Sequence, residues 1–288
     1  MPSSIPASAT RPALVRLARR KPLGAFGAII VVAMLVMAVF AERIAPHAYD
    51  ETIRGARMKP PSTAYWLGTD NLGRDIWSRI VYGARVSVIM GFATVALGIV
   101  VATIIGVSTG YLGGAYDLCV QRIVDAWLSF PYLVIILSVM AVLGPWLLNV
   151  VLSLALIIAA SSSRVIRGAT LSVAEQTYVE AARAAGCRHL RVIARHILPN
   201  VMPTIIVLAT INLGGVILAE SALSFLGFGV PPPFPSWGAM LSGSGRTYMF
   251  RAPWMLIAPA VALSLVVYSV NMFGDALRDI LDPRLRGT

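Results

Sequence analysis

The sequence predicts an all-α membrane protein with six transmembrane helices. Of its 288 residues, 57% are hydrophobic and only 13% are charged, and the mean hydropathy is +0.77. A soluble domain carries about a quarter charged residues, and one soluble core cannot bury this much apolar surface. Long uncharged stretches alternate with short basic loops. In hydrocarbon these stretches are expected to be helices, because a helix satisfies its own backbone hydrogen bonds.

Uncharged runs and turn residues place the spans. The first run, of 19 residues, is longer than the core of about 7–15 residues of a cleaved signal peptide, which favours a retained helix. The run 126–163 is too long for one span, and Gly144-Pro145 divides it. The expected spans are Leu23–Ala41, a helix within Val86–Tyr116, a helix from near Leu118 to Gly144 that includes Arg122 and Asp125, Trp146–Ser162, His196–Ala219 and Ala252–Gly274.

The distribution of Arg and Lys predicts the orientation. The N-terminal arm is basic and carries no acidic residue, which places it in the cytoplasm. The loop 164–195 carries six arginines against Glu175 and Glu180 and also falls inside. Segments 42–85 and 221–251 then lie outside, and both termini are cytoplasmic. The net charge of +11 is therefore interpreted as a topology signal and not as nucleic-acid binding.

The two external segments are the largest polar inserts. Asp75–Arg85 is consistent with an amphipathic helix at the membrane interface, with Ile76, Ile80 and Val81 on one side. The alternative is a structured loop that only joins helices. Residues Pro231–Gly238 form a proline-rich run that is expected to be rigid; it contacts substrate or packs as a turn on its own helices.

The cytoplasmic loop predicts a short helix. Ser172–Glu175 and Thr177–Glu180 both match the S/T-x-x-E capping box, and the second is expected to start a helix of about eight residues at Tyr178. Gly186 is expected to end it in the left-handed conformation. One face of this helix carries Tyr178, Ala181, Ala182 and Ala185. Such a helix suits a soluble partner, although spacing alone leaves open that Glu180 only caps its own helix.

No phosphate-binding loop occurs, because neither Lys21 nor Lys59 follows glycine. Energy for any transport is therefore expected from another polypeptide or from an ion gradient. An ion-coupled transporter would place ionisable groups within spans, where Asp125, Glu220 and His196 are the candidates; Arg122 lies one turn from Asp125, and Glu220 lies near the external boundary.

Other chemistry has little support. An intramembrane enzyme would need a nucleophile such as one of Ser161–Ser163 with His196 as base, but no Gly-x-Ser-x-Gly or His-Glu-x-x-His pattern occurs. Cys119 and Cys187 are isolated, so they predict neither a disulfide nor a metal site.

Several motifs together resemble one family. Glu180-Ala181-Ala182, three residues, Gly186, nine residues and His196-Ile197-Leu198-Pro199 look like the EAA motif of ABC importer permeases, with His196 where the family pattern has Ile. Further segments resemble the second, C-type subunit of the dipeptide/oligopeptide/nickel permease family over about residues 11–286. These are residues 66–75, 82–85, 223–227, 235–238 and 274–279.

This resemblance implies a type I ABC importer permease fold with an extra N-terminal helix, in a bacterial cytoplasmic membrane. It divides the chain into an arm (1–22), a first helix with external segment (23–85), the importer domain (86–275) with its coupling loop at about 164–198, and a tail (276–288). The implied partners are a second homologous permease, two cytoplasmic ATPase domains that bind ATP and Mg²⁺, and an external substrate-binding protein. No cofactor or metal is expected in this chain itself.

The same resemblance implies the site residues. The implied ATPase-coupling residues are Glu180, Ala181, Ala182, Arg183 and Gly186. The candidates for an external gate or docking surface are Asp70, Arg74, Asp75, Phe234 and Trp237. Peptides are the first expectation for the substrate, and nickel chelates or another small solute are the alternative.

Overall fold

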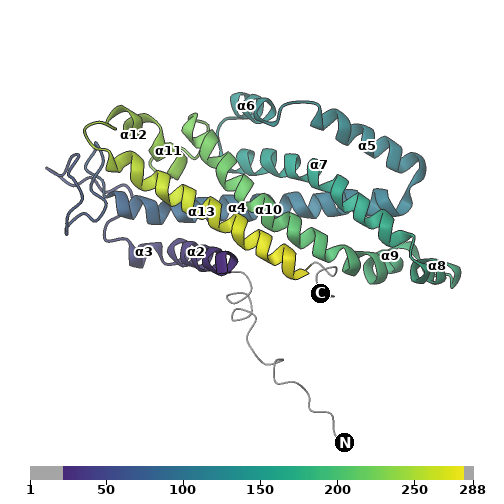
Figure 1. The fold of residues 1–288 in the computed structure, drawn as a ribbon. Helices are drawn as coiled ribbons and strands as arrows, with labels where there is room; N and C mark the ends of the chain where they lie inside the picture. Colours follow the sequence, from purple (N-terminus) through teal and green to yellow (C-terminus); the bar gives the residue numbers. More distant parts are fainter. Residues whose placement is uncertain (1–21, 282–288) are drawn as a thin grey trace, which may run out of the picture.

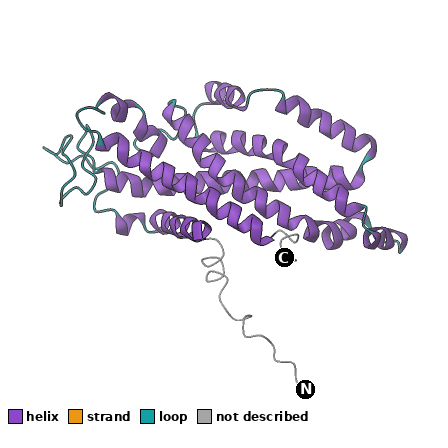
Figure 2. Ribbon diagram, viewed as in Figure 1, coloured by secondary structure: helices purple, strands orange, loops and turns teal. Residues whose placement is uncertain are grey.

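The computed structural model describes residues 22–281, which form a bundle of long helices (Figures 1 and 2). The helices are α2 Pro22–Val39, α3 Ala41–Ile44, α4 Ile76–Leu112, α5 Gly114–Leu128, α6 Tyr132–Leu143, α7 Leu147–Ala174, α8 Thr177–Ala184, α9 His189–Val192, the π-helix η1 Ile193–Ile197, α10 Leu198–Phe225, α11 Trp237–Leu241, α12 Gly243–Thr247 and α13 Trp254–Leu281.

Five of these helical stretches are long and apolar enough to cross a membrane, and the bent pair α5–α6 makes six when it is counted as one span. The bundle has two distinct ends. The loop 45–75, α11 and α12 lie at one end, called here the loop end, and α8 lies at the opposite end, called the α8 end (Figure 1).

Helices α4 and α7 are held together by glycines. A Cβ atom at Gly98, Gly106 or Gly110 would lie within 3 Å of α7, at Ile158, Ser163 and Thr170 respectively. Small residues let two helix backbones approach closely, which favours association in lipid, where the hydrophobic effect gives no drive. The same device joins α2 to α13, where Gly24 faces Ala276 and Gly27 faces Ser269.

The expected interfacial helix at Asp75–Arg85 is wrong. Its residues form the first turns of α4, and Ile76, Ile80 and Val81 are buried. Asp75 is the N-cap, and its carboxylate accepts a hydrogen bond from the backbone N–H of Ser78 at 2.8 Å. No proline interrupts the helix before Leu112, so it continues straight into the span and crosses the boundary expected at 85/86.

The expected third span is not one straight helix. Helices α5 and α6 meet at an angle of 80°. The break falls at Ser129–Pro131, because Pro131 has no backbone N–H to donate and disfavours helical backbone in the residue before it. The next break agrees with the prediction, since α6 ends at Leu143 and Gly144 adopts a φ of 82° before α7.

Other helices extend beyond their expected ends. Helix α7 runs to Ala174 instead of Ser162, α10 reaches Phe225, and α13 reaches Leu281. Absence of charge marks only the part of a helix that lies in lipid, so uncharged runs do not predict the polar continuation of each helix.

Candidate functional site

The first candidate site is the α8 loop, residues 175–197, at the α8 end of the bundle (Figure 1). Helix α8 has the expected eight residues. It follows α7 after a short turn and is followed by α9 and η1, which lead into α10. A chain of short helices thus fills the connection between two long ones.

The predicted capping boxes are wrong. Gln176 is the N-cap of α8, and no side chain caps the helix, so Thr177 is already its first residue. Ser172 lies inside α7, where its hydroxyl donates to the carbonyl of Gly168 at 3.3 Å. Helix α7 continues past Ser172, so the extended backbone that an N-cap needs occurs only at Gln176 (φ −75°, ψ 140°).

The end of α8 agrees with the prediction. Gly186 has a φ of 77°, in the left-handed region. Its N–H donates to the carbonyl of Arg183 at 2.9 Å, and the N–H of Cys187 donates to the carbonyl of Ala182 at 3.1 Å. These two bonds form a Schellman motif, which satisfies carbonyls that the helix end would otherwise leave free. The turn after α8 is therefore defined by backbone geometry.

Buried residues fix the α8 loop to the bundle. Val179, Val192 and Ile197 are fully buried. The hydroxyl of Tyr111, near the end of α4, lies 3.1 Å from Nδ1 of His189, and the guanidinium of Arg183 lies 4.6 Å from the centroid of the Tyr111 ring. No local sequence pattern predicts this anchor, because 78 residues separate Tyr111 from His189.

The outer face of the α8 loop is open. Glu180, Ala181, Ala185 and Gly186 are exposed. Within residues 22–281, the Glu180 carboxylate has no hydrogen bond or ion pair, so it does not cap its own helix. Arg183 is also exposed and rests on Tyr111, whereas Ala182 packs partly against the core. The geometry presents a small-residue surface with one free carboxylate on a fixed support.

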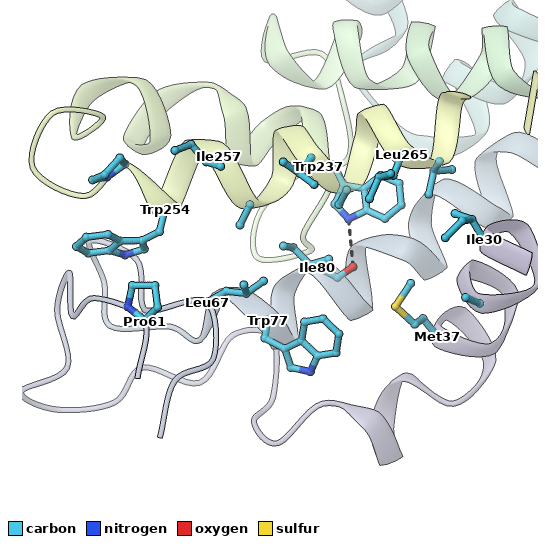
Figure 3. A pocket seen from close by; sticks show the side chains of 16 residues that line it. Ile30, Met37, Pro61, Leu67, Trp77, Ile80, Trp237, Trp254, Ile257 and Leu265 are labelled. Atoms are coloured by element: carbon cyan, nitrogen blue, oxygen red, sulfur yellow. Dashed lines mark hydrogen bonds between the residues drawn. The ribbon is translucent and has the colours of Figure 1, made fainter. Parts of the chain in front are cut away.

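The loop-end candidates divide into buried and exposed residues. Trp237 is fully buried, and its indole N–H donates to the carbonyl of Ile80 at 3.1 Å (Figure 3). Asp75 is buried as the cap of α4. Asp70 is buried and accepts from Nε of Arg74 at 2.6 Å. Phe234 is half exposed and stacks on Tyr49 at 5.6 Å between ring centroids.

Two cavities lie near these residues. One, of about 600 Å³, is lined by apolar side chains of α2, α4 and α13 together with Trp77, Trp237 and Trp254 (Figure 3). The other, of about 630 Å³, brings Asp70, Arg74 and Phe234 together with Arg79. Asp75 and Trp237 do not line this second cavity. Sequence reasoning missed Arg79, because one arginine in a mixed-charge segment has no distinguishing pattern.

The ionisable residues within the spans also differ from expectation. Glu220 does not lie in an exposed boundary region; it is 1% exposed, and its carboxylate accepts a hydrogen bond from Ser224 at 2.7 Å. Asp125 pairs with Arg164 of α7 as well as with Arg122. A further pair joins α5 to α7, since Nε of Arg167 donates to Asp117 at 2.6 Å.

Comparison with known protein families decides the assignment. Residues 98–287 match the model of the binding-protein-dependent transport system inner membrane component, which is well over half of the chain. The chain belongs to this family. Residues 13–61 also match the N-terminal transmembrane domain of oligopeptide transport permease C, which contains α2.

Similar curated proteins are permease subunits. The dipeptide transport system permease protein DppC of Alkalihalophilus pseudofirmus is 40% identical over 93% of this chain and 88% of its own length. The probable D,D-dipeptide transport system permease protein DdpC of Escherichia coli is 38% identical over 95% of this chain and 92% of its own. The glutathione transport system permease protein GsiD of Escherichia coli is 38% identical over 93% and 89%.

The fold is that of type I ABC importer permeases with an additional N-terminal helix. A solved structure of the inward-facing MetNI methionine ABC transporter matches with a TM-score of 0.57, covering 72% of this chain and 97% of that chain at 19% identity. A second crystal form of the same transporter matches with a TM-score of 0.56. At this identity the likeness concerns the fold alone.

Proposed function

We propose that this inner membrane component imports short peptides as one of two permease subunits of an ABC importer. The named activities of the relatives support the substrate class, because dipeptides, D,D-dipeptides and glutathione are all small peptides. The single observation that carries the mechanism is the α8 loop, which presents a free carboxylate and small residues on a fixed support.

In this proposal α8 is the coupling helix, and Glu180, Ala181, Ala182, Arg183 and Gly186 contact a cytoplasmic ATPase subunit. The exposed alanines allow close approach of a protein surface, and the unpaired Glu180 carboxylate is available to a basic group. Movement of α8 would pass to α4 through Tyr111 and to α10 through η1, which is rigid-body transfer through packed helices.

The remaining assembly follows from the same proposal. The α8 end is cytoplasmic and the loop end is external, as the arginine-rich loop favours. ATP and Mg²⁺ are bound by two partner ATPase domains. A second, homologous permease completes the pathway, and an external binding protein delivers the peptide to the loop end. Phe234 is exposed and is the candidate for contact with the binding protein. Asp70, Asp75 and Trp237 are buried, so they would support the loop-end surface without touching the partner.

Uptake in a strain that lacks this gene tests the substrate. Labelled di-, tri- and longer peptides and nickel are offered in turn, and the gene is then restored. We expect loss and recovery of short-peptide uptake with unchanged nickel uptake. Loss of nickel uptake with intact peptide uptake would contradict the peptide assignment.

Substitutions in α8 test the coupling role. Glu180→Lys reverses a charge that has no partner among the described residues, and we expect transport to fail while the chain still accumulates in the membrane. Glu180→Gln keeps the size of the side chain and should reduce transport less. Normal transport and normal peptide-stimulated ATP hydrolysis by Glu180→Lys would show that α8 does not couple the subunits.

A further inference from the structure

The cavity of about 630 Å³ at the loop end is lined by residues of several segments. Its walls come from the start of α4, the end of α10, α11 and the run Pro231–Phe234. The polar lining residues are Asp70, Arg74, Arg79, Ser224, Ser242 and Ser244. Prolines, methionines and Phe234 provide the apolar wall. A concave, mostly apolar site of this size with a few polar groups suits a small molecule.

Arg79 is the unusual residue of this cavity. It is only 7% exposed, and its guanidinium donates one hydrogen bond, to the backbone carbonyl of Tyr49 at 2.9 Å. Guanidinium has five N–H donors, and a buried charge without a counterion is costly. Arg79 also lies in the first turn of α4, where the helix dipole disfavours a cation.

The nearby carboxylates form no ion pair with Arg79 among residues 22–281. Asp70 pairs with Arg74 at 2.6 Å. Oδ2 of Asp75, four residues before Arg79, accepts from the backbone N–H and the hydroxyl of Ser78 at 2.8 and 2.7 Å, whereas Oδ1 is buried without a hydrogen-bond partner in the described residues. Asp70, and more weakly the exposed Asp50, attract Arg79 electrostatically without forming an ion pair with it. In residues 22–281 no carboxylate forms an ion pair with Arg79. One positive charge without an ion-pair partner in the described part of the chain therefore borders the cavity.

We infer that Arg79 binds the C-terminal carboxylate of a peptide that enters this cavity. The planar fork of a guanidinium matches a carboxylate. Because Asp70 already offsets Arg74, the cavity offers one net positive charge, which suits a singly charged carboxylate better than a doubly charged phosphate. The apolar wall then faces the peptide side chains. This inference rests on the proposed import of peptides.

The test uses the complete importer in lipid vesicles, with alanyl-alanine and its C-terminal amide as probes. The affinity of the binding protein for each probe is measured separately, and uptake is measured with loaded binding protein at saturation. We expect Arg79→Gln to lower alanyl-alanine uptake by about tenfold, the scale of losing one charge-assisted hydrogen bond. Uptake of the amide should not change, and Arg79→Lys should recover part of the loss.

A second measurement removes the binding protein from the comparison. Both probes are titrated onto the detergent-solubilised importer alone, where wild type should prefer the free carboxylate and Arg79→Gln should not. The matched control is Arg54→Gln, which removes an exposed charge in the loop 45–75; Arg54 does not line the cavity. It should behave like wild type.

The outcomes separate this inference from the peptide assignment. If wild type transports neither probe but transports another solute, the peptide assignment fails. If wild type transports alanyl-alanine and Arg79→Gln lowers both probes equally, Arg79 serves folding or contact with the binding protein, and the carboxylate site is refuted. The carboxylate site is also refuted if Arg79→Gln leaves unchanged both the ratio of alanyl-alanine uptake to amide uptake and the binding of the two probes to the solubilised importer.

Discussion

The guanidinium of Arg183 lies 4.6 Å from the centre of the Tyr111 ring, and the hydroxyl of that tyrosine lies 3.1 Å from Nδ1 of His189. One side chain near the end of α4 thus contacts two of the three short helices of the α8 loop, α8 and α9. The proposed coupling role requires the surface of α8 to keep a fixed orientation relative to the membrane helices. Tyr111 provides this fixed orientation through a cation–π contact and a hydrogen bond.

Tyr111→Leu should loosen the α8 loop. Exposed cation–π contacts contribute about 0.5–1 kcal/mol and a hydrogen bond about 1 kcal/mol. We expect amide hydrogen exchange in α8 to become about tenfold faster, as measured by mass spectrometry. Tyr111→Phe retains the ring below Arg183 and should show a smaller increase. Equal exchange in Tyr111→Leu and wild type would show that Val179 and Val192 hold the loop without Tyr111.

The close contact of α4 and α7 predicts opposite effects at two helical glycines. A Cβ at Gly106 would lie 2.6 Å from the carbonyl oxygen of Ser163, so Gly106→Ala should destabilise the bundle by about 1–3 kcal/mol. Gly168, on α7, has open space around the same position, so Gly168→Ala should stabilise by about 0.5–1 kcal/mol. Thermal unfolding in detergent measures both. Changes of the same sign would contradict this packing.

The position that ends α8 favours glycine because of its backbone conformation and not because a neighbouring atom leaves no room for a side chain. Gly186 has a φ of 77°, and no atom lies within 4 Å of a Cβ placed there. Gly186→Ala should cost about 1–2 kcal/mol of local stability and lower transport. Gly186→Asn should be milder, because asparagine tolerates the left-handed region. Transport rates and hydrogen exchange of residues 182–187 are the measurements, and equal effects of Ala and Asn would exclude the conformational explanation.

The ion pair between Asp117 and Arg167 predicts a rescue. Nε of Arg167 donates to Asp117 at 2.6 Å, which joins α5 to α7. Asp117→Arg places two cations side by side and should lower the unfolding temperature. The double variant Asp117→Arg/Arg167→Asp restores opposite charges and should recover stability. If the loss of stability in the double variant equals the sum of the losses in the two single variants, the pair contributes no coupling energy.

Arg122→Gln is the matched control for this rescue. Arg122 lies on the same helix but is mostly exposed, and it approaches Asp125 only to 3.7 Å. Exposed ion pairs contribute little, so the unfolding temperature of this variant should stay close to wild type.

Local chemistry explains which predictions agree with the structure. The apolar runs predicted the spans because the bilayer core contains no water, so a helix that crosses it needs apolar side chains and internal backbone hydrogen bonds. Gly144 and Gly186 predicted two breaks because both need a positive φ. The capping boxes at Ser172 and Thr177 failed because a matching pattern does not determine where the preceding helix stops, and α7 continues to Ala174.

The sequence by itself determined the membrane class, the approximate spans, the family motifs and the short helix at Glu180. These properties depend on composition and on residues close together in the chain. Only the tertiary structure decided that Trp237 is buried against Ile80 and that, among residues 22–281, Glu180 has no partner and Arg79 borders a cavity without a carboxylate in an ion pair with it. Each of these properties depends on how helices pack against one another. Contacts between residues far apart in the sequence produce no local sequence pattern from which they could be predicted.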